Sequence, residues 1–181
     1  MISDKASDVM PQWSPDGRSL LFQRQTLNAN GTVASSLLTI LDLQSKVLSG
    51  LPGSENLMNP SWSPDGRYVA ALSDDGRKLV VLHLQSQPWS ELTTGVGFAA
   101  GPFWTRDSTC VYVQEVWSGA EQPIFKVRVK DSKKELVATT KQLVRNDTLG
   151  YALVGLAPDD SPVATLLVRD TDIYALEFDF P

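Results

Sequence analysis

The chain has 181 residues, 42% of them hydrophobic and 20% charged, a composition typical of a folded globular protein and not of a disordered one. Sixteen basic and twenty-one acidic side chains give a net charge of −5, which argues against sequence-independent binding to nucleic acid or to an anionic membrane. A single cysteine, Cys110, excludes an internal disulfide, and no stretch approaches the ~20 apolar residues of a membrane-spanning helix.

An eight-residue motif near the start of the chain occurs twice. Residues 11–18 read Pro-Gln-Trp-Ser-Pro-Asp-Gly-Arg and residues 60–67 read Pro-Ser-Trp-Ser-Pro-Asp-Gly-Arg, identical at seven of eight positions. A weaker copy, Pro-Phe-Trp-Thr-Arg-Asp-Ser, follows at 102–108, and a fourth lies at 155–161, where Leu156 stands at the tryptophan position. The motif therefore repeats four times.

The tryptophan positions of these motifs are 49, 42 and 52 residues apart, counted from 13 to 62, 104 and 156. A period of about 40 to 50 residues is the length of one four-stranded blade of a β-propeller, although helical solenoids have similar periods. The runs between the motifs must therefore decide between strands and helices.

These runs have the composition of strands. One β-rich run follows each motif, at 19–24, 68–72, 109–114 and 162–168, and a second follows at 37–43, 78–84, 124–129 and 172–178. Several alternate with period two, and no window carries a capped helical stripe. The sequence predicts an all-β protein, a β-propeller with four blades of antiparallel strands at approximately 9–49, 58–93, 101–139 and 152–181.

The Ser-Pro-Asp-Gly segments predict hairpin turns between the first two strands of each blade. Proline fixes φ, aspartate hydrogen-bonds back to the backbone, and glycine adopts the positive φ. The preceding tryptophan is expected to end the first strand and to pack between adjacent blades. The structural anchors predicted in this way are Trp13, Asp16, Gly17, Trp62, Asp65, Gly66, Trp104 and Asp107.

Catalytic signatures are absent from the sequence. No Gly-x-Ser-x-Gly nucleophile elbow occurs, and the one histidine, His83, lies in the alternating run 78–84, where a neighbouring side chain would satisfy it. Acidic pairs at 74–75 and 159–160 fall in tight-turn sequences. One histidine and one cysteine cannot form a usual zinc site, whereas calcium binding by carboxylates alone stays open. We therefore predict no catalytic residue, no cofactor, no assigned metal ligand, and a protein that is not an enzyme.

A partner would contact the longer loops or the mouth of the central channel. Three segments read as such loops: 25–36, 115–121 and 145–151. Trp117 is the first candidate, because exposed tryptophan is enriched at interaction hot spots. The predicted contact residues are Trp117, Glu115, Arg145 and Tyr151. They would serve a protein partner or a small ligand at the propeller face.

The strands do not add up to a closed ring. Only three strands can be counted from the fourth motif to Pro181, and an open sheet edge invites pairing with another chain. We expect either the C-terminal part of a larger propeller or a homodimer in which two sets of four blades form an eight-bladed ring.

The Pro-x-Trp-Ser-Pro-Asp-Gly-Arg motif resembles the propeller repeats of TolB-type proteins and of prolyl-oligopeptidase-type propeller domains, over almost the whole chain. Segments 156–162, 167–170 and 172–176 are similar to the C-terminus of bacterial proteins that join a winged-helix DNA-binding domain to such a propeller. The first resemblance implies a fold and not a function. The second implies the sensory or interaction domain of a regulator, in the periplasm, with a cytoplasmic location left open.

The function predicted from these features is a non-catalytic binding or interaction propeller, the sensory or scaffold part of a bacterial transcriptional regulator or envelope protein. The alternative is a propeller that supports a peptidase-type hydrolase domain absent from this chain. A third possibility is a propeller that hydrolyses glycosides with acidic residues alone. A winged helix encoded upstream would favour the first function, and a nucleophile elbow there would favour the second.

Overall fold

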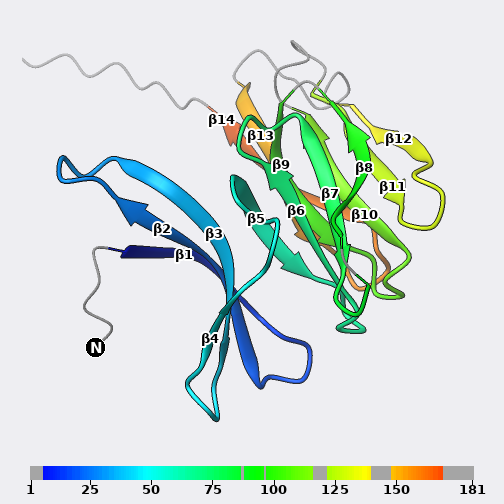
Figure 1. Ribbon diagram of the computed structural model, residues 1–181. Helices are drawn as coiled ribbons and strands as arrows, with labels where there is room; N and C mark the ends of the chain where they lie inside the picture. The colour runs from blue at the N-terminus through cyan, green and yellow to red at the C-terminus, as the bar shows by residue number, and fades with distance from the viewer. Residues whose placement is uncertain (1–5, 87, 96, 116–121, 140–147, 169–181) are drawn as a thin grey trace, which may run out of the picture.

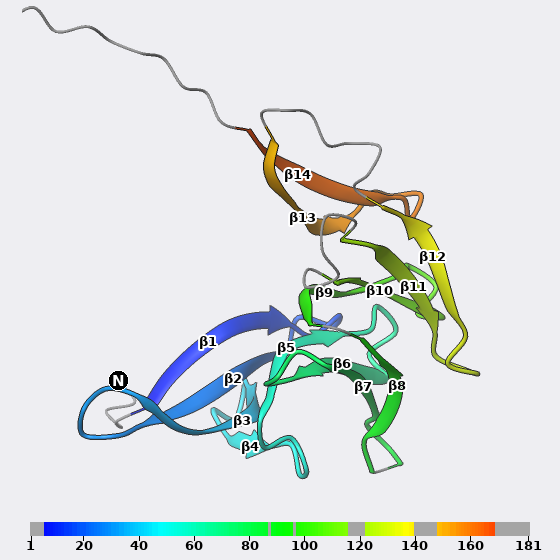
Figure 2. The same ribbon diagram turned by 90° about the horizontal axis from the view of Figure 1, so that it is seen from above.

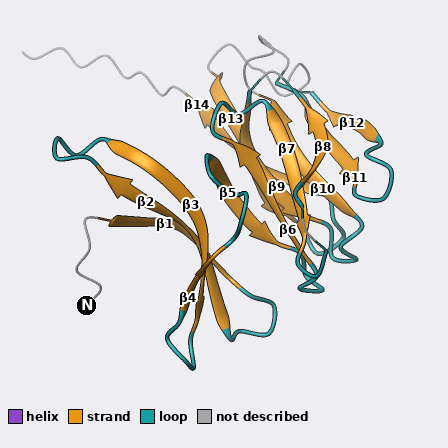
Figure 3. Ribbon diagram, viewed as in Figure 1, coloured by secondary structure: helices purple, strands orange, loops and turns teal. Residues whose placement is uncertain are grey.

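The computed structural model describes residues 6–86, 88–95, 97–115, 122–139 and 148–168. Within these ranges every regular element is a β-strand, as Figure 3 shows by colour. The same ranges contain no helix long and apolar enough to cross a membrane. The prediction of an all-β fold is confirmed; the predicted run at 172–178 lies outside the described residues.

The described strands form four sheets in chain order. The first sheet contains β1 (Ala6–Trp13), β2 (Ser19–Leu27), β3 (Val33–Asp42) and β4 (Leu48–Gly50). The second contains β5 (Leu57–Trp62), β6 (Tyr68–Ser73), β7 (Lys78–His83) and β8 (Ser90–Thr94). The third contains β9 (Phe98–Trp104), β10 (Cys110–Glu115), β11 (Ile124–Arg128) and β12 (Lys134–Ala138). The fourth contains β13 (Thr148–Leu156) and β14 (Pro162–Val168).

The first three sheets are antiparallel meanders of four strands and the fourth is an antiparallel pair, and we call the four sheets blades 1 to 4 (Figure 1). The first strands of the blades contact one another in the order β1, β5, β9, β13. Viewed from above, these strands lie toward a common axis and the later strands lie farther out (Figure 2). The arrangement is that of a partial β-propeller.

Hydrophobic side chains fill the spaces between neighbouring blades. Leu21 and Leu38 of blade 1 pack with Val69 and Ala71 of blade 2 in one cluster. Successive strand residues point to opposite faces, so Ala70, which lies between Val69 and Ala71, packs instead in a cluster with residues of blade 3. A third cluster joins blades 3 and 4. We call the side of a blade that meets the preceding blade its leading face, and the opposite side its trailing face.

The four motif turns share a positive φ at one position. The residue at the glycine position has a positive φ in every copy: 69° at Gly17, 72° at Gly66, 60° at Ser108 and 63° at Asp160. Glycine adopts this conformation without strain, whereas serine and aspartate adopt it at some cost. The third and fourth turns therefore keep the positive φ although the sequence has lost the glycine. The fourth turn closes one residue earlier than the others, because the Ala157 N–H donates to the Ser161 carbonyl oxygen four positions on, where the other three bonds span five positions.

A second recurring irregularity lies in the inner strands, three residues before each tryptophan. Met10, Asn59 and Gly101 have positive φ values of 55°, 51° and 100°. The ladder is shifted around all three of these residues, which identifies β-bulges. At Gly101 a Cβ atom would lie 2.7 Å from the carbonyl oxygen of Tyr112, so only glycine fits there.

The structure shortens one predicted loop. The segment 25–36 was expected to be a long loop, but β2 continues to Leu27 and β3 begins at Val33. Gln25 pairs with Ser36 and Thr26 pairs with Ser35. The prediction was wrong because polar residues in an exposed hairpin extension have the composition of a loop while their backbone groups continue the ladder.

Candidate functional site

The aspartates of the motif turns are held by local hydrogen bonds. The Ser14 hydroxyl and the Arg18 backbone N–H donate to Asp16 Oδ1 at 2.6 and 3.0 Å. The same pattern recurs at Asp65 and Asp107. Because these bonds stabilise the ionised carboxylate, with the Ser14 hydroxyl as the largest cause, the pKa of Asp16 lies below its ordinary value. Each of these aspartates therefore accepts hydrogen bonds from residues of its own turn and stabilises that turn.

Where serine or aspartate replaces the glycine of the motif, its side chain links neighbouring blades. The backbone N–H of Asp65 donates to Ser108 Oγ at 3.1 Å, and the backbone N–H of Arg106 donates to Asp160 Oδ1 at 3.0 Å. The Arg106 guanidinium also donates to the carbonyl oxygen of Pro158 at 2.8 Å. Sequence reasoning missed these links, although the two replacements at one motif position were their visible signal.

The three anchor tryptophans have three environments. Trp104 is 8% exposed, and its Nε1 donates to the Ser61 carbonyl oxygen at 3.1 Å. Trp62 is half-buried against the cluster of blades 1 and 2, and among the described residues its buried Nε1 finds no hydrogen-bond partner. Trp13 is 63% exposed. The motif tryptophan packs on the preceding blade, and none precedes blade 1 within the described ranges, so the packing of Trp13 between blades stays a prediction.

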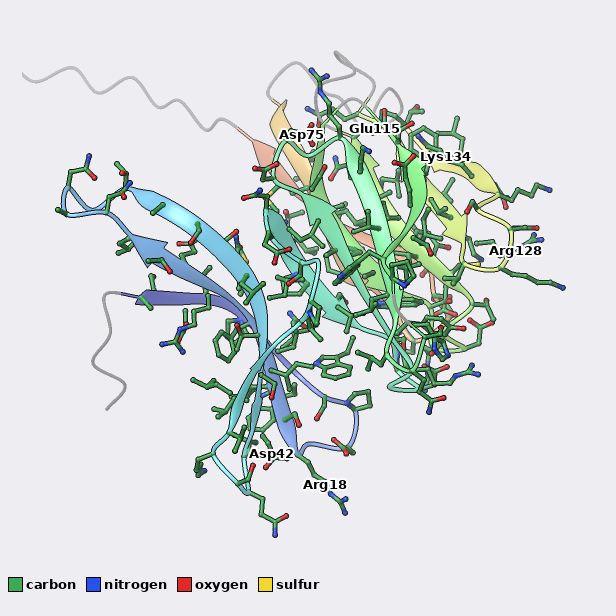
Figure 4. The ribbon with its side chains drawn as sticks, viewed as in Figure 1. Arg18, Asp42, Asp75, Glu115, Arg128 and Lys134 are labelled. Atoms are coloured by element: carbon green, nitrogen blue, oxygen red, sulfur yellow. The ribbon has the colours of Figure 1, made fainter. Side chains whose placement is uncertain are left out.

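Glu115, a predicted contact residue, is 6% exposed at the end of β10. Its Oε1 lies 2.7 Å from Lys134 Nζ, which also lies 3.8 Å from the centre of the Phe125 ring. Figure 4 shows Glu115 and Lys134 toward the opposite end of the molecule from Arg18 and Asp42. A buried, ion-paired carboxylate is committed to its partner within the blade, so this placement argues against the predicted contact of Glu115 with a partner molecule.

The other predicted contact residues are placed less completely. Trp117 and Arg145 lie outside the described residues. Tyr151 lies within β13, where it pairs with Leu166 of β14. The loop predicted at 145–151 therefore gives way to strand at Thr148.

The inner strands of all four blades line a cavity of about 370 Å³. Its lining residues are Met10 and Gln12 from β1, Asn59, Pro60 and Ser61 from β5, Gly101, Pro102 and Phe103 from β9, and Ala152 and Leu153 from β13. Amide and hydroxyl groups can donate and accept hydrogen bonds there, and none of these lining residues titrates near neutral pH. The cavity therefore suits contact with neutral polar groups.

A groove of about 590 Å³ lies between blades 2 and 3, at the end where the motif turns lie. Its charged lining residues are Arg67, Glu91, Arg128 and Lys130, and His83 lies among them. Arg67 and Arg128 already pair with Asp65 and Asp131, at 2.7 and 3.1 Å. The groove has a surplus of basic side chains, but local carboxylates neutralise two of them, so its attraction for an anion is weakened.

No protein-family model matches the chain. The uncharacterized peptidase YuxL of Bacillus subtilis (strain 168) is 27% identical over 109 residues, 57% of this chain and 16% of the relative. TolB from Acinetobacter baumannii is similar in structure with a TM-score of 0.63 and 17% identity, over 90% of this chain and 38% of that chain. Pyrococcus horikoshii acylaminoacyl peptidase has a TM-score of 0.60 and 12% identity, over 74% and 25%.

These similarities establish a TolB-like propeller fold, as the repeat motif predicted. The chain spans less than half the length of each of the three proteins. The prediction that the protein is not an enzyme is corrected, because its relative is named as a peptidase and a peptidase is among the structures that share the fold. The catalytic signatures sought in the sequence belong to a hydrolase domain, whereas this chain corresponds to a propeller domain.

Proposed function

We propose that this chain is the propeller part of a peptidase-type protein whose hydrolase domain lies outside these 181 residues. The observation that carries the proposal is the 27% identity, over 109 residues of this chain, to a protein named as a peptidase. The shared fold with the acylaminoacyl peptidase agrees with it. The sequence motif resembles prolyl-oligopeptidase-type propellers as well as TolB-type repeats.

The cavity lined by the four inner strands, here called the axial cavity, is the part of this chain that would contact a substrate in such a protein. Gln12, Asn59 and Ser61 line it with amide and hydroxyl groups. A peptide backbone is neutral and rich in hydrogen-bonding groups, so these side chains match its chemistry. Within the proposal, the cavity contacts peptide substrates on their way to the hydrolase domain.

Labelling of the native protein tests the proposal. The chain is tagged at its own coding locus, purified under native conditions, and treated with a fluorophosphonate probe, which modifies the nucleophile of active serine hydrolases. We expect label on the polypeptide that carries this sequence, or on one that elutes with it in constant ratio. Heat-inactivated protein is the control. An unlabelled preparation of intact native protein would contradict the proposal.

A binding propeller of a bacterial envelope protein or regulator is the second candidate, favoured by the similarity to TolB over 90% of this chain. The regulator interpretation rests on sequence resemblance within 156–176, part of which lies outside the described residues. Its periplasmic location stays a prediction. A winged helix and a membrane span in the adjoining coding sequence would favour this candidate, and a nucleophile elbow would favour the peptidase.

A further inference from the structure

The groove between blades 2 and 3 is built by two four-stranded blades. It has a volume of about 590 Å³ and lies where the trailing face of blade 2 meets the leading face of blade 3. Its apolar lining is the edge of the hydrophobic cluster between these blades: Val81 and Leu92 are buried, and Tyr68 and Val129 are half-buried. A space of this size with apolar walls and a few polar groups is typical of a small-molecule site.

The charges that line the groove are balanced except for one. Arg67 and Arg128 are paired with aspartates, and Glu91 is paired with Lys78 at 3.0 Å. The ammonium group of Lys130 has no hydrogen bond and no ion pair with any residue in the described ranges. A ligand with one negative charge matches this single ammonium, whereas a dianion would have to draw a guanidinium group away from its aspartate.

His83 adds a hydrogen-bond donor to the lining of the groove. Its Nδ1 accepts a hydrogen bond from the backbone N–H of Gln85 at 3.3 Å, so the proton of the neutral imidazole lies on Nε2. No residue that the structure describes accepts a hydrogen bond from this Nε2–H. The imidazole stands edge-on to the Tyr68 ring, with ring centres 4.8 Å apart, which places it at the border of the apolar lining.

We propose that this groove binds a small carboxylate with an apolar body, the chemistry that an acylated apolar amino acid shares with the C-terminal residue of a peptide. The apolar group packs on Leu92 and Val129, and the Lys130 ammonium and the Nε2–H of His83 bind the carboxylate. Because local pairing weakens the attraction for anions in general, the ligand needs the apolar contact as well as the charge. The groove shares no lining residue with the axial cavity, so this inference stands independently of the peptidase proposal.

Titration of the untagged 181-residue chain with N-acetyl-L-phenylalanine, followed by nuclear magnetic resonance, tests the inference. His83 is the one histidine of the sequence, so the imidazole signals belong to it alone. We expect these signals to shift with saturation as the probe is added. N-acetyl-L-phenylalaninamide lacks the carboxylate and acetate lacks the apolar body, so each should bind at least about 5-fold more weakly.

Two lysines of the connection between β11 and β12 give a matched pair of variants. Lys130→Gln removes the uncompensated charge and should lower the affinity for the probe about 2- to 5-fold. Lys133 is also exposed but does not line the groove, so Lys133→Gln should bind like the wild type. Circular dichroism checks that both variants are folded.

A tripeptide with the sequence Ala-Ala-Phe, acetylated at its N-terminus, identifies the source of the ligand. Binding as tight as that of N-acetyl-L-phenylalanine would assign the groove to peptide C-termini. Binding of the amino acid derivative without the tripeptide would assign it to a free acid. Both results support the proposed chemistry.

Three results would overturn the inference. One is the absence of a saturable shift of the His83 signals with N-acetyl-L-phenylalanine. Another is equal binding of acetate, which would show an adventitious ion only, or equal binding of the amide, which would show that the charge has no role. The last is an equal loss of affinity in Lys130→Gln and Lys133→Gln, which would assign the effect to the overall charge of the chain.

Discussion

Trp104 of blade 3 and Ser61 of blade 2 are joined by a hydrogen bond of 3.1 Å from the indole Nε1 to the carbonyl oxygen. Tyr68 of blade 2 stacks on the same indole with ring centres 6.0 Å apart. One side chain therefore fills the space between two blades and also satisfies its own polar group, which is the usual requirement for a buried tryptophan. The motif tryptophan derives its environment from the blade before it.

Shortening Trp104 should destabilise the protein strongly. Trp104→Ala removes a side chain that is 8% exposed and leaves a cavity between blades 2 and 3, so we expect a loss of about 3–5 kcal/mol in the free energy of unfolding. Trp104→Phe keeps an aromatic ring but leaves the Ser61 oxygen without its donor, and should cost about 1–2 kcal/mol. Urea unfolding measures both. Equal stabilities of the two variants would mean that the space closes without the ring.

Two glycines provide a paired test of the inner strand. At Gly101, φ is +100° and a Cβ atom would lie 2.7 Å from the Tyr112 oxygen, so Gly101→Ala should cost about 2–4 kcal/mol from strain and overpacking. At Gly155 of β13, no atom lies within 4 Å of a Cβ atom. Gly155→Ala should therefore be neutral or stabilise by about 0.5–1 kcal/mol. Thermal unfolding of both variants measures the difference. Similar midpoints would show that the bulge adapts to a side chain.

The repeat made the sheets predictable. Two copies of the motif, identical at seven of eight positions, set the turns, and alternating runs between them set the strands. Backbone conformation outside the motif and the burial of side chains between blades were not predictable from the repeat. Asn59, with its positive φ, lies one residue before the repeated motif and outside the positions that repeat, and the exposure of Trp13 depends on a neighbouring blade and not on local sequence.

The candidate site was less predictable than the fold. Glu115 looked like a loop residue next to Trp117, but it ends β10 and pairs with Lys134, nineteen positions later. Such a pairing depends on the register of β10, β11 and β12, which the sequence does not specify. Neutral side chains such as Gln12, which line the cavity between the inner strands, are common throughout the sequence and do not by themselves indicate a site.

Breaking the ion pair of Glu115 should destabilise blade 3. Glu115→Gln leaves the partly buried Lys134 ammonium without its carboxylate, so we expect a loss of about 1–3 kcal/mol in the free energy of unfolding. Lys134→Met alone leaves the buried Glu115 carboxylate without its ammonium partner, and should have a similar cost. The double variant removes both charges, and should be more stable than the sum of the single effects predicts. Additive losses in urea unfolding would show that the two groups do not interact.

Acid should weaken the motif turns through their aspartates. Hydroxyl and backbone donors, with the Thr105 hydroxyl as the largest cause, lower the pKa of Asp107 in the folded chain, and the Ser161 hydroxyl does the same for Asp159. A carboxyl group whose pKa is lower in the folded state stabilises the fold fully above its unfolded pKa of about 4, and this stabilisation is lost as the pH falls through the folded value. The free energy of unfolding should therefore be level near neutral pH and fall below pH of about 4. Urea unfolding from neutral pH downward measures this profile. Asp107→Asn should be less stable than the wild type at neutral pH and approach it in acid; a gap that widens with acidification would contradict the assignment.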